Sequence, residues 1–201
     1  GIGMAIAEHL ARTVRAKLVL VSRSPFPPQT EWTQWTNAHD DRDATTIGIR
    51  KIQALTAMGA EVLVLNADIA DLDQMQAVRD RLYQTFGELH GIFHAAGVLG
   101  DGIMQIKAPE TAAGVMRPKV QGTLVLHQIF GATTLDFWVL FSSLSAVLGG
   151  LGQVDYCAAN CFLDAFARSQ ASNQQQRILS IDWDMWQEVG MGADLTGLPD
   201  Y

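Results

Sequence analysis

Four polar side chains in the second half of the sequence have the chemistry needed to reduce a carbonyl group. Ser143 follows the apolar run Phe137–Phe141 and stands 13 residues before Tyr156, with a glycine-rich loop between them. Asn160 follows Tyr156 by one helical turn, so both side chains face the same side of a predicted helix. Lys119 lies in another predicted helix, 24 residues before the serine.

Reduction of a ketone requires delivery of a hydride and protonation of the developing alkoxide. A phenol is a weak acid at neutral pH, so Tyr156 can act as the general acid when a nearby cation such as Lys119 favours its ionised form. Ser143 can hold the carbonyl oxygen, as donors do in an oxyanion hole. Taken alone, each residue would more often have an ordinary structural role: a tyrosine in the core, a lysine on the surface or a serine at the end of a strand. Together, at these spacings, they indicate catalysis.

A glycine-containing turn of Gly1, Ile2 and Gly3 comes directly before a predicted helix at Met4–Val14. Backbone N–H groups and the helix dipole at such a turn favour the phosphates of a dinucleotide. About 20 residues further on, after the next strand, dinucleotide-binding folds contact the adenosine ribose. Ser22 and Arg23 stand there, and a guanidinium suits a 2′-phosphate where a carboxylate would favour NAD. We therefore predict NADPH as the cofactor.

Two further strand ends carry polar or small residues that suit the same cofactor. Asp68, with Ile69 beside it, follows the predicted strand Glu61–Leu65 and can accept a hydrogen bond from an adenine amino group. Ala95, Ala96 and Gly97 follow another predicted strand, where small residues let a flat cofactor approach the backbone. These positions share the carboxyl edge of a parallel sheet, where such folds bind ligands.

Short apolar runs alternate with helical patterns along the whole chain. The predicted strands are Ala16–Val21, Glu61–Leu65, Gly91–His94, Phe137–Phe141 and Ile178–Ile181, and the predicted helices are Met4–Val14, Ile49–Met58, Leu72–Phe86, Pro109–Phe130 and Tyr156–Gln170. This alternation predicts a single α/β domain over residues 1–201, with a Rossmann-like doubly wound parallel sheet and helices on both faces.

Residues 24–46 are longer than an ordinary strand-to-helix connection. They contain three prolines, Trp32, Trp35 and the charged cluster Asp40–Asp43. We interpret them as an irregular surface insertion that its tryptophans pin to the domain. A docking site for a partner is the alternative interpretation.

Composition narrows the class of protein. Hydrophobic residues make up 48% and charged residues 17%, as in a packed enzyme, and the net charge of −7 argues against a nucleic-acid partner. No apolar run approaches the roughly 20 residues that span a bilayer, and nothing resembles a signal peptide, so we expect a soluble cytoplasmic protein without a membrane partner. Cys157 and Cys161 lie on one predicted helix at a spacing that does not favour a disulfide, so we expect two small core residues in a reducing compartment. No pattern of metal ligands is evident.

The sequence resembles the short-chain dehydrogenase/reductase superfamily, and within it the ketoreductase domains of modular polyketide synthases. Matching stretches cover nearly the whole chain: GIGMAIAEHLA, HAAGV, RPKVQGT and GQVDYCAANCFLDAFA. The superfamily usually places a lysine four residues after its tyrosine. The polyketide ketoreductases place asparagine there and carry the lysine on the preceding helix, as Asn160 and Lys119 do here.

The resemblance implies NADPH-dependent reduction of a β-ketoacyl thioester on the phosphopantetheine arm of an acyl carrier protein, beside other synthase domains. Tyr156 would be the acid, Ser143 would hold the carbonyl, Lys119 would bond the nicotinamide ribose, and Asn160 would orient Lys119 or a relay water. It also implies that residues 182–201, including Trp183 and Trp186, begin a substrate lid. The resemblance further implies a chain truncated at both ends, with the first strand missing, and therefore unstable or inactive alone.

The resemblance is weaker at positions that correlate with the configuration of the alcohol product. Ketoreductases of one class carry Leu-Asp-Asp after HAAGV, whereas this chain reads Leu99-Gly100-Asp101. The opposite class carries a tryptophan eight residues before the tyrosine, where this chain has Leu148. Leu151 and Asp155 replace a frequent proline and asparagine. The pattern favours the Leu-Asp-Asp class.

Three other functions are compatible with parts of the sequence. A catalytically silent structural domain would keep the fold, although the intact set of four polar residues argues against it. A free-standing dehydrogenase acting on a small carbonyl would more usually carry lysine at position 160. A non-enzymatic interaction module has the Trp32/Trp35 insertion as its support.

Overall fold

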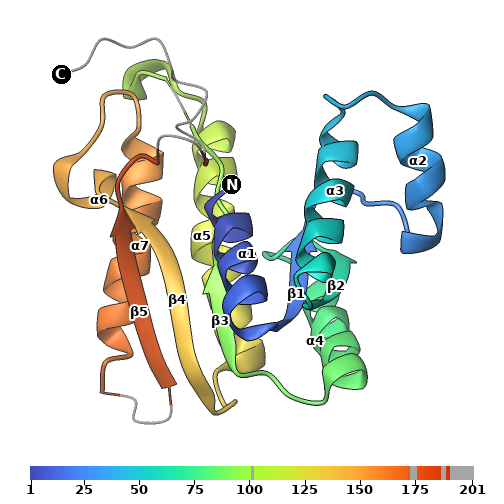
Figure 1. The fold of residues 1–201 in the computed structure, drawn as a ribbon. Helices are drawn as coiled ribbons and strands as arrows, with labels where there is room; N and C mark the ends of the chain where they lie inside the picture. The colour runs from blue at the N-terminus through green and yellow to red at the C-terminus, as the bar shows by residue number, and fades with distance from the viewer. Residues whose placement is uncertain (101, 173–175, 187–188, 191–201) are drawn as a thin grey trace.

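The structure is a computed structural model that describes residues 1–100, 102–172, 176–186 and 189–190. Helices and strands alternate along the chain, as expected (Figure 1). The helices are α1 (Ile2–Val14), α2 (Trp32–Ala38), α3 (Ala44–Ala57), α4 (Leu72–Phe86), α5 (Pro109–Phe130), α6 (Ser145–Leu148) and α7 (Val154–Ser169). The strands are β1 (Lys17–Ser22), β2 (Glu61–Asn66), β3 (Gly91–His94), β4 (Leu135–Ser143) and β5 (Gln176–Trp183). Two short 3-10 turns, η1 (Gln29–Glu31) and η2 (Met104–Ile106), lie in connections.

The strands form two parallel sheets within the described residues. β1 pairs with β2 over its whole length, and β4 lies between β3 and β5. The predicted α/β class and parallel strands are therefore confirmed, but the one sheet that we expected is divided between β1 and β3. Parallel pairing brings the carboxyl ends of neighbouring strands to a common edge.

The largest hydrophobic core lies on the face covered by α4, α5 and α7. Trp138 and Leu140 of β4 and Leu163 of α7 are fully buried in it, and Met75 and Val78 extend it to α4. Leu65 of β2 and Ile92 of β3 pack against the same cluster. One continuous core therefore joins the two sheets, although the described residues show no strand pairing between them.

A smaller core lies beneath α1 and α3. Ala7 and Ala11 of α1 are buried against Leu55 of α3, and Leu18 and Leu20 of β1 pack against this cluster. The small alanine side chains let the helix approach β1 closely. Figure 1 shows α1 and α3 in front of the sheets and α4 behind β2, so helices cover both faces of the β1–β2 sheet.

The insertion after Arg23 is more regular than the sequence suggested, and the prediction of an irregular segment over residues 24–46 is wrong. It contains η1, α2 and the first residues of α3. The polar residues of low helix propensity and the three prolines gave no local indication of a helix, and α2 is stabilised instead by tertiary contacts. Trp32 is buried against Ile49 and Ile52 of α3, and its indole N–H donates to the carbonyl of Pro27 (2.8 Å).

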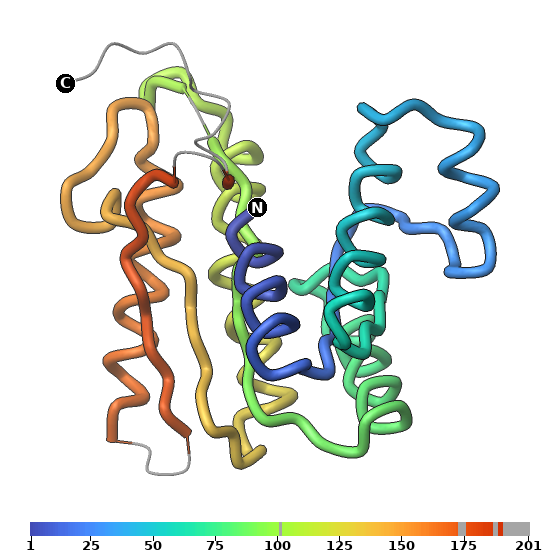
Figure 2. The backbone as a smooth tube through the Cα atoms, in the orientation of Figure 1, coloured from blue at the N-terminus to red at the C-terminus, as the bar shows by residue number. Residues whose placement is uncertain are grey.

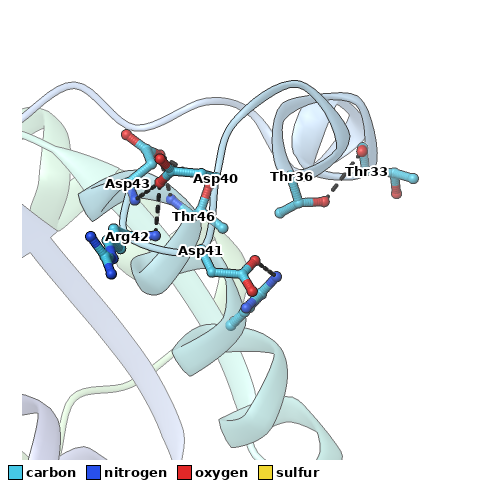
Figure 3. A network of polar contacts seen from close by, with 8 residues as sticks. Thr33, Thr36, Asp40, Asp41, Arg42, Asp43 and Thr46 are labelled. Carbon is cyan, nitrogen blue, oxygen red and sulfur yellow. Dashed lines mark hydrogen bonds and ion pairs between the residues drawn. The ribbon is translucent and has the colours of Figure 1, made fainter.

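Asp43 is the residue that fastens the insertion to α3. Its side chain caps α3 by accepting from the backbone N–H of Thr46 (2.8 Å), and it also accepts from the indole N–H of Trp35 (3.0 Å). Asp40 accepts from the backbone N–H groups of Arg42 and Asp43, which closes the turn that precedes the helix (Figure 3). The tryptophans therefore attach the segment to the body of the domain, as predicted.

We predict that Asp43→Ala lowers the midpoint of thermal unfolding by about 2–4 °C, because it removes the helix cap and the indole bond together. Asp43→Asn retains an acceptor oxygen for both bonds and is the matched control. The indole bond and then the Thr46 bond lower the pKa of Asp43, so its stabilising effect is present above the ordinary carboxyl pKa and is lost as the pH falls through the lowered value. Equal midpoints for the alanine and asparagine variants, measured by circular dichroism, would contradict this account.

Candidate active site

Lys119 is a buried ammonium group in the middle of α5. Its side chain leaves the helix toward β4, where Nζ donates to the backbone carbonyl of Phe141 (2.6 Å), and the residue is 3% exposed. Burial lowers the pKa of Lys119 to about 8, and the negative charge of Asp164 opposes that shift. A cation therefore occupies the protein interior near the end of β4.

Tyr156 lies beside this cation. Nζ of Lys119 is 5.9 Å from the centre of the Tyr156 ring, which lies in the first turn of α7 and is partly exposed. Two residues 37 positions apart in the sequence are thus adjacent because α5 and α7 pack together against β4. The arrangement can supply a proton from the phenol with a positive charge nearby.

Asn160 connects α7 to itself and to β4. Its side-chain amide donates to the backbone carbonyl of Tyr156 (2.9 Å), and its backbone carbonyl accepts from the hydroxyl of Ser142 (3.3 Å). The side chain is fully buried, and its Oδ1 atom has no partner among the described residues. A buried amide oxygen without a donor is uncommon in proteins, which suits an acceptor for a bound water, as in the predicted relay.

Ser143 is the last residue of β4, next to Ser142, and is half-buried. Its hydroxyl oxygen accepts from the backbone N–H of Ser145 (3.2 Å), which leaves the O–H free to donate. The structure therefore brings Lys119, Tyr156 and Asn160 into one cluster, with Ser143 at the strand end beside it.

The predicted phosphate turn lies close to the end of β3. A Cβ atom added at Gly3 would lie 3.2 Å from the Cβ of Ala95, so the turn and this strand end are in contact distance. Ile2 lies beside Gly190, whose added Cβ would be 3.4 Å from the isoleucine side chain. Gly1 is exposed, with open space where a side chain would be. The amino end of α1 is thus near the carboxyl edge of the sheet (Figure 1).

Ser22 is the last residue of β1 and Arg23 follows it, and both are exposed. The side-chain amide of Asn66, at the end of β2, donates to the carbonyls of Ser22, Arg23 and Ser24, at 2.9 Å each. This bond set fixes the backbone at the end of β1. The guanidinium of Arg23 forms no ion pair with any residue that the structure describes and is accessible to a ligand.

The carboxylate of Asp68, the predicted acceptor for adenine, has two partners within the protein. One oxygen lies 2.7 Å from the guanidinium of Arg117 and the other accepts from the backbone N–H of Ala70. Ile69 packs into the large core near Gly122 of α5. These contacts hold the loop after β2 against α5. Lone pairs on the Asp68 oxygens still leave capacity for a further donor.

The small residues after β3 lie where the sequence predicted. Ala95 is exposed, and Ala96 and Gly97 are half-buried at the end of the strand. His94, just before them, is buried, and burial followed by the charge of Lys119 lowers its pKa to about 3. The imidazole is therefore neutral at physiological pH and adds no second cation beside Lys119.

Sequence reasoning missed three charged residues at this site. Asp164 lies one helical turn after Asn160 on α7 and accepts from the hydroxyl of Ser180 (2.6 Å), so the spacing from Tyr156 and Asn160 could have indicated it. Lys107 and Asp155 form a buried ion pair (2.8 Å). Burial alone would raise the pKa of Asp155, but the hydrogen bonds from Lys107 and Tyr156 hold it below its ordinary value. No local sequence pattern predicts this ion pair, because the two residues lie far apart in the sequence.

Trp183 ends β5 and contacts both Phe141 and Trp186, with ring centres 5.7 and 5.2 Å apart. These contacts place the two tryptophans in one aromatic cluster with Phe141, and the lid role of the segment stays a prediction. Residues 187–188 and 191–201, most of the predicted lid region, lie outside the described residues. Asp101 also lies outside them.

Three further findings concern metal ligands, helix hydropathy and cysteines among the described residues. No group of three or more His, Cys, Asp or Glu side chains among them is placed to hold a metal ion. None of their helices combines the length and hydropathy that a membrane span requires. Cys157 and Cys161 are both free thiols, but Cys157 is half-buried and Cys161 is exposed, so the prediction of two core residues is wrong.

Comparison with known proteins identifies the family. The KR domain family matches residues 1–188. The chain therefore belongs to the KR domain family, the ketoreductase domains of polyketide synthases, which confirms the resemblance seen in the sequence.

Relatives of this chain are much longer proteins. It is 35% identical over 195 residues to 6-methylsalicylic acid synthase of Aspergillus terreus, covering 96% of this chain and 10% of that protein. It is 34% identical over 197 residues to polyketide synthase PksL of Bacillus subtilis, covering 96% of this chain and 4% of that protein. The chain thus spans a tenth or less of these two curated relatives.

Solved structures show the same fold. A ketoreductase domain from the bacillaene assembly line is 34% identical with a TM-score of 0.78, over 94% of this chain and 43% of that one. A structure of A-type ketoreductases from a modular polyketide synthase is 33% identical with a TM-score of 0.79, over 95% of this chain and 37% of that one.

The buried ammonium predicts a specific dependence of stability on pH. Because the pKa of Lys119 in the folded protein is about 8, below its ordinary value of 10.5, the unfolded state binds more protons between these two values. The free energy of unfolding of the cofactor-free protein, relative to that of Lys119→Met, therefore rises as the pH increases from about 8 to 10.5. Urea unfolding at several pH values measures this difference. Parallel pH profiles for the two proteins would contradict the lowered pKa.

Proposed function

We propose that this chain catalyses the NADPH-dependent reduction of a β-ketoacyl thioester to the β-hydroxyacyl thioester within a cytoplasmic polyketide synthase. The substrate is presented on the phosphopantetheine arm of an acyl carrier protein, beside neighbouring synthase domains. The observation that carries the proposal is the buried ammonium of Lys119, 5.9 Å from the ring of Tyr156. Membership in the KR domain family supports the reaction type.

The cofactor requires a close backbone approach, phosphate donors and a partner for the 2′-phosphate. Gly1, Ile2 and Gly3 offer backbone N–H groups at the amino end of α1, a helix of 13 residues. Ala95, next to Gly3, presents a small side chain, and the exposed Arg23 supplies the cation. These residues fit reduced nicotinamide adenine dinucleotide phosphate, which would supply the hydride when bound.

The chain's own residues then deliver the proton. The hydroxyl of Ser143 donates to the substrate carbonyl oxygen and holds it near Tyr156. As the carbon accepts hydride, the oxygen becomes an alkoxide and takes the proton of the Tyr156 phenol. The ammonium of Lys119 stabilises the phenolate that remains, and the buried oxygen of Asn160 holds a water through which the phenolate regains a proton.

Two alternatives fit the observations less well. Burial of an ammonium group costs free energy, and a catalytically silent domain would gain nothing from it. Lys119 is nevertheless buried beside Tyr156, with 3% of its surface exposed. A free-standing dehydrogenase of small carbonyls would be expected to resemble proteins of its own length, whereas the curated relatives above are long synthases.

We predict that Tyr156→Phe lowers kcat for a β-ketoacyl thioester surrogate by about 10²–10⁴-fold, the usual contribution of a general acid. NADPH binding stays unchanged, because the hydroxyl is the only group removed. Oxidation of NADPH, followed by absorbance in the native polypeptide that carries this chain, measures the rate. Tyr83→Phe on α4 is the matched control, since Tyr83 packs on the large core. Equal loss in both variants, or none in Tyr156→Phe, would contradict the assignment.

We predict that Arg23→Ala weakens NADPH binding by about 10–100-fold, because a charge-assisted bond to the 2′-phosphate is lost. NADH binding changes little, since NADH lacks that phosphate. Fluorescence titration with each cofactor measures both affinities. Arg12→Ala, an exposed arginine in the last turn of α1, is the control for a general loss of positive charge. Equal weakening of both cofactors in Arg23→Ala would count against the predicted NADPH preference.

A further inference from the structure

A buried ion pair joins the loop after β3 to the first turn of α7. Nζ of Lys107 lies 2.8 Å from Oδ1 of Asp155, and the two side chains are 4% and 1% exposed. Every other ion pair among the described residues has a side chain that is more than half exposed. Burial of two charges is costly unless geometry and further hydrogen bonds compensate for lost hydration. This pair therefore has a more specific environment than the surface pairs.

The ammonium of Lys107 uses all three of its N–H groups. Besides Asp155, it donates to the carbonyls of Gly100 and Gly152, each at 3.2 Å. The three acceptors belong to the loop after β3, the loop before α7 and the first turn of α7. Figure 2 shows these two loops side by side at the same end of the molecule. One side chain thus links the loop after β3 to the stretch of chain that leads into and begins α7.

Asp155 transmits this cross-link to the backbone of Tyr156. The residue before α7, Gln153, makes no side-chain capping bond. Instead Oδ1 of Asp155, the atom that holds Lys107, accepts from the backbone N–H of Tyr156 (2.9 Å). The start of the helix at the proposed proton donor is therefore held by the ion pair rather than by an ordinary cap.

Two glycines make the close approach of these loops possible. A Cβ atom added at Gly100 would lie 2.3 Å from Cγ2 of the buried Val115 and 2.9 Å from Oδ2 of Asp155. Gly152 has a φ of 74° and faces the backbone of Gly102, 3.3 Å from where its own Cβ would be. The glycine at position 100, where the Leu-Asp-Asp pattern has aspartate, thus leaves the space that Asp155 occupies.

We propose that Lys107 and Asp155 are positioning residues for Tyr156, a role that rests on the function proposed above. Their ion pair fixes the backbone of Tyr156 relative to the loop that begins with Ala95, Ala96 and Gly97, the proposed cofactor contacts. Both side chains are almost completely buried, so the pair acts on Tyr156 through the backbone of that residue. It sets the geometry between the proton donor on α7 and the cofactor edge of β3.

The test compares Lys107→Met, Asp155→Ala and Asp155→Asn in the native polypeptide, with NADPH and a β-ketoacyl thioester surrogate. We expect the first two to lower kcat by about 100-fold, the cost of a misplacement near 1 Å, with unchanged NADPH affinity. Asp155→Asn keeps an oxygen for both bonds and retains most of the activity. Arg50→Met removes an exposed ion pair with Asp41 and serves as the control with unchanged kcat.

The double variant Lys107→Met/Asp155→Asn keeps the proposal testable if either single variant fails to fold. It leaves no unpaired buried charge, which is the main source of instability when one partner is removed. We expect its unfolding temperature to return close to that of the wild type while kcat remains low, because the loop after β3 and the start of α7 are no longer linked. Recovery of both stability and kcat would overturn the positioning role and leave a structural one.

Amide hydrogen exchange separates this proposal from the proposed function, because it requires no turnover. Lys107→Met is expected to speed exchange at Tyr156 and at Gly152, whether or not the wild type reduces the surrogate. A wild type that binds NADPH but reduces no β-ketoacyl thioester would overturn the proposed function. Unchanged exchange in the variant would overturn the positioning role.

Discussion

The burial of one ammonium group constrains the candidate site more than any other interaction. Lys119 is almost without solvent contact, so its charge must be met by protein groups. The carbonyl of Phe141 accepts from it at 2.6 Å, and Asp164 on α7 supplies a compensating charge. These partners come from β4 and α7, and the lysine comes from α5. Its position therefore depends on the packing of both helices on the strand, and the same packing places Tyr156 beside it.

A second constraint comes from the parallel strands. Their carboxyl ends share an edge, and the turn at the start of α1 reaches that edge where Gly3 approaches Ala95. Side-chain amides and ion pairs, rather than further strand pairing, hold the connecting loops in place. Asn66 holds the end of β1, Arg117 holds the loop after β2 through Asp68, and Lys107 holds the loop after β3. The proposed cofactor site is thus formed by loops, each of which is held in position by its own polar side chain.

Much of this architecture was predictable from local patterns. The bounds of α4 and α5 match the predicted ones, and the spacing of Tyr156 and Asn160 placed them on one face of a helix because helical periodicity is a local property. Asp164 follows the same periodicity. By contrast, the ion pair of Lys107 with Asp155 joins residues 48 positions apart, and no periodic pattern encodes such a contact. The helix α2 was missed because its stability comes from burial of Trp32, and the division into two sheets is a tertiary property that strand patterns do not express.

The most direct test of the central claim follows the hydride itself. The native polypeptide would be incubated with a β-ketoacyl thioester surrogate and with NADPH that carries deuterium at the transferable position, and the product would be examined by mass spectrometry and NMR. The account predicts a β-hydroxyacyl thioester with deuterium on its β-carbon, formed by the wild type and lost with Tyr156→Phe. Tight binding of the cofactor without deuterium in any product would contradict it and would favour a structural role for the domain.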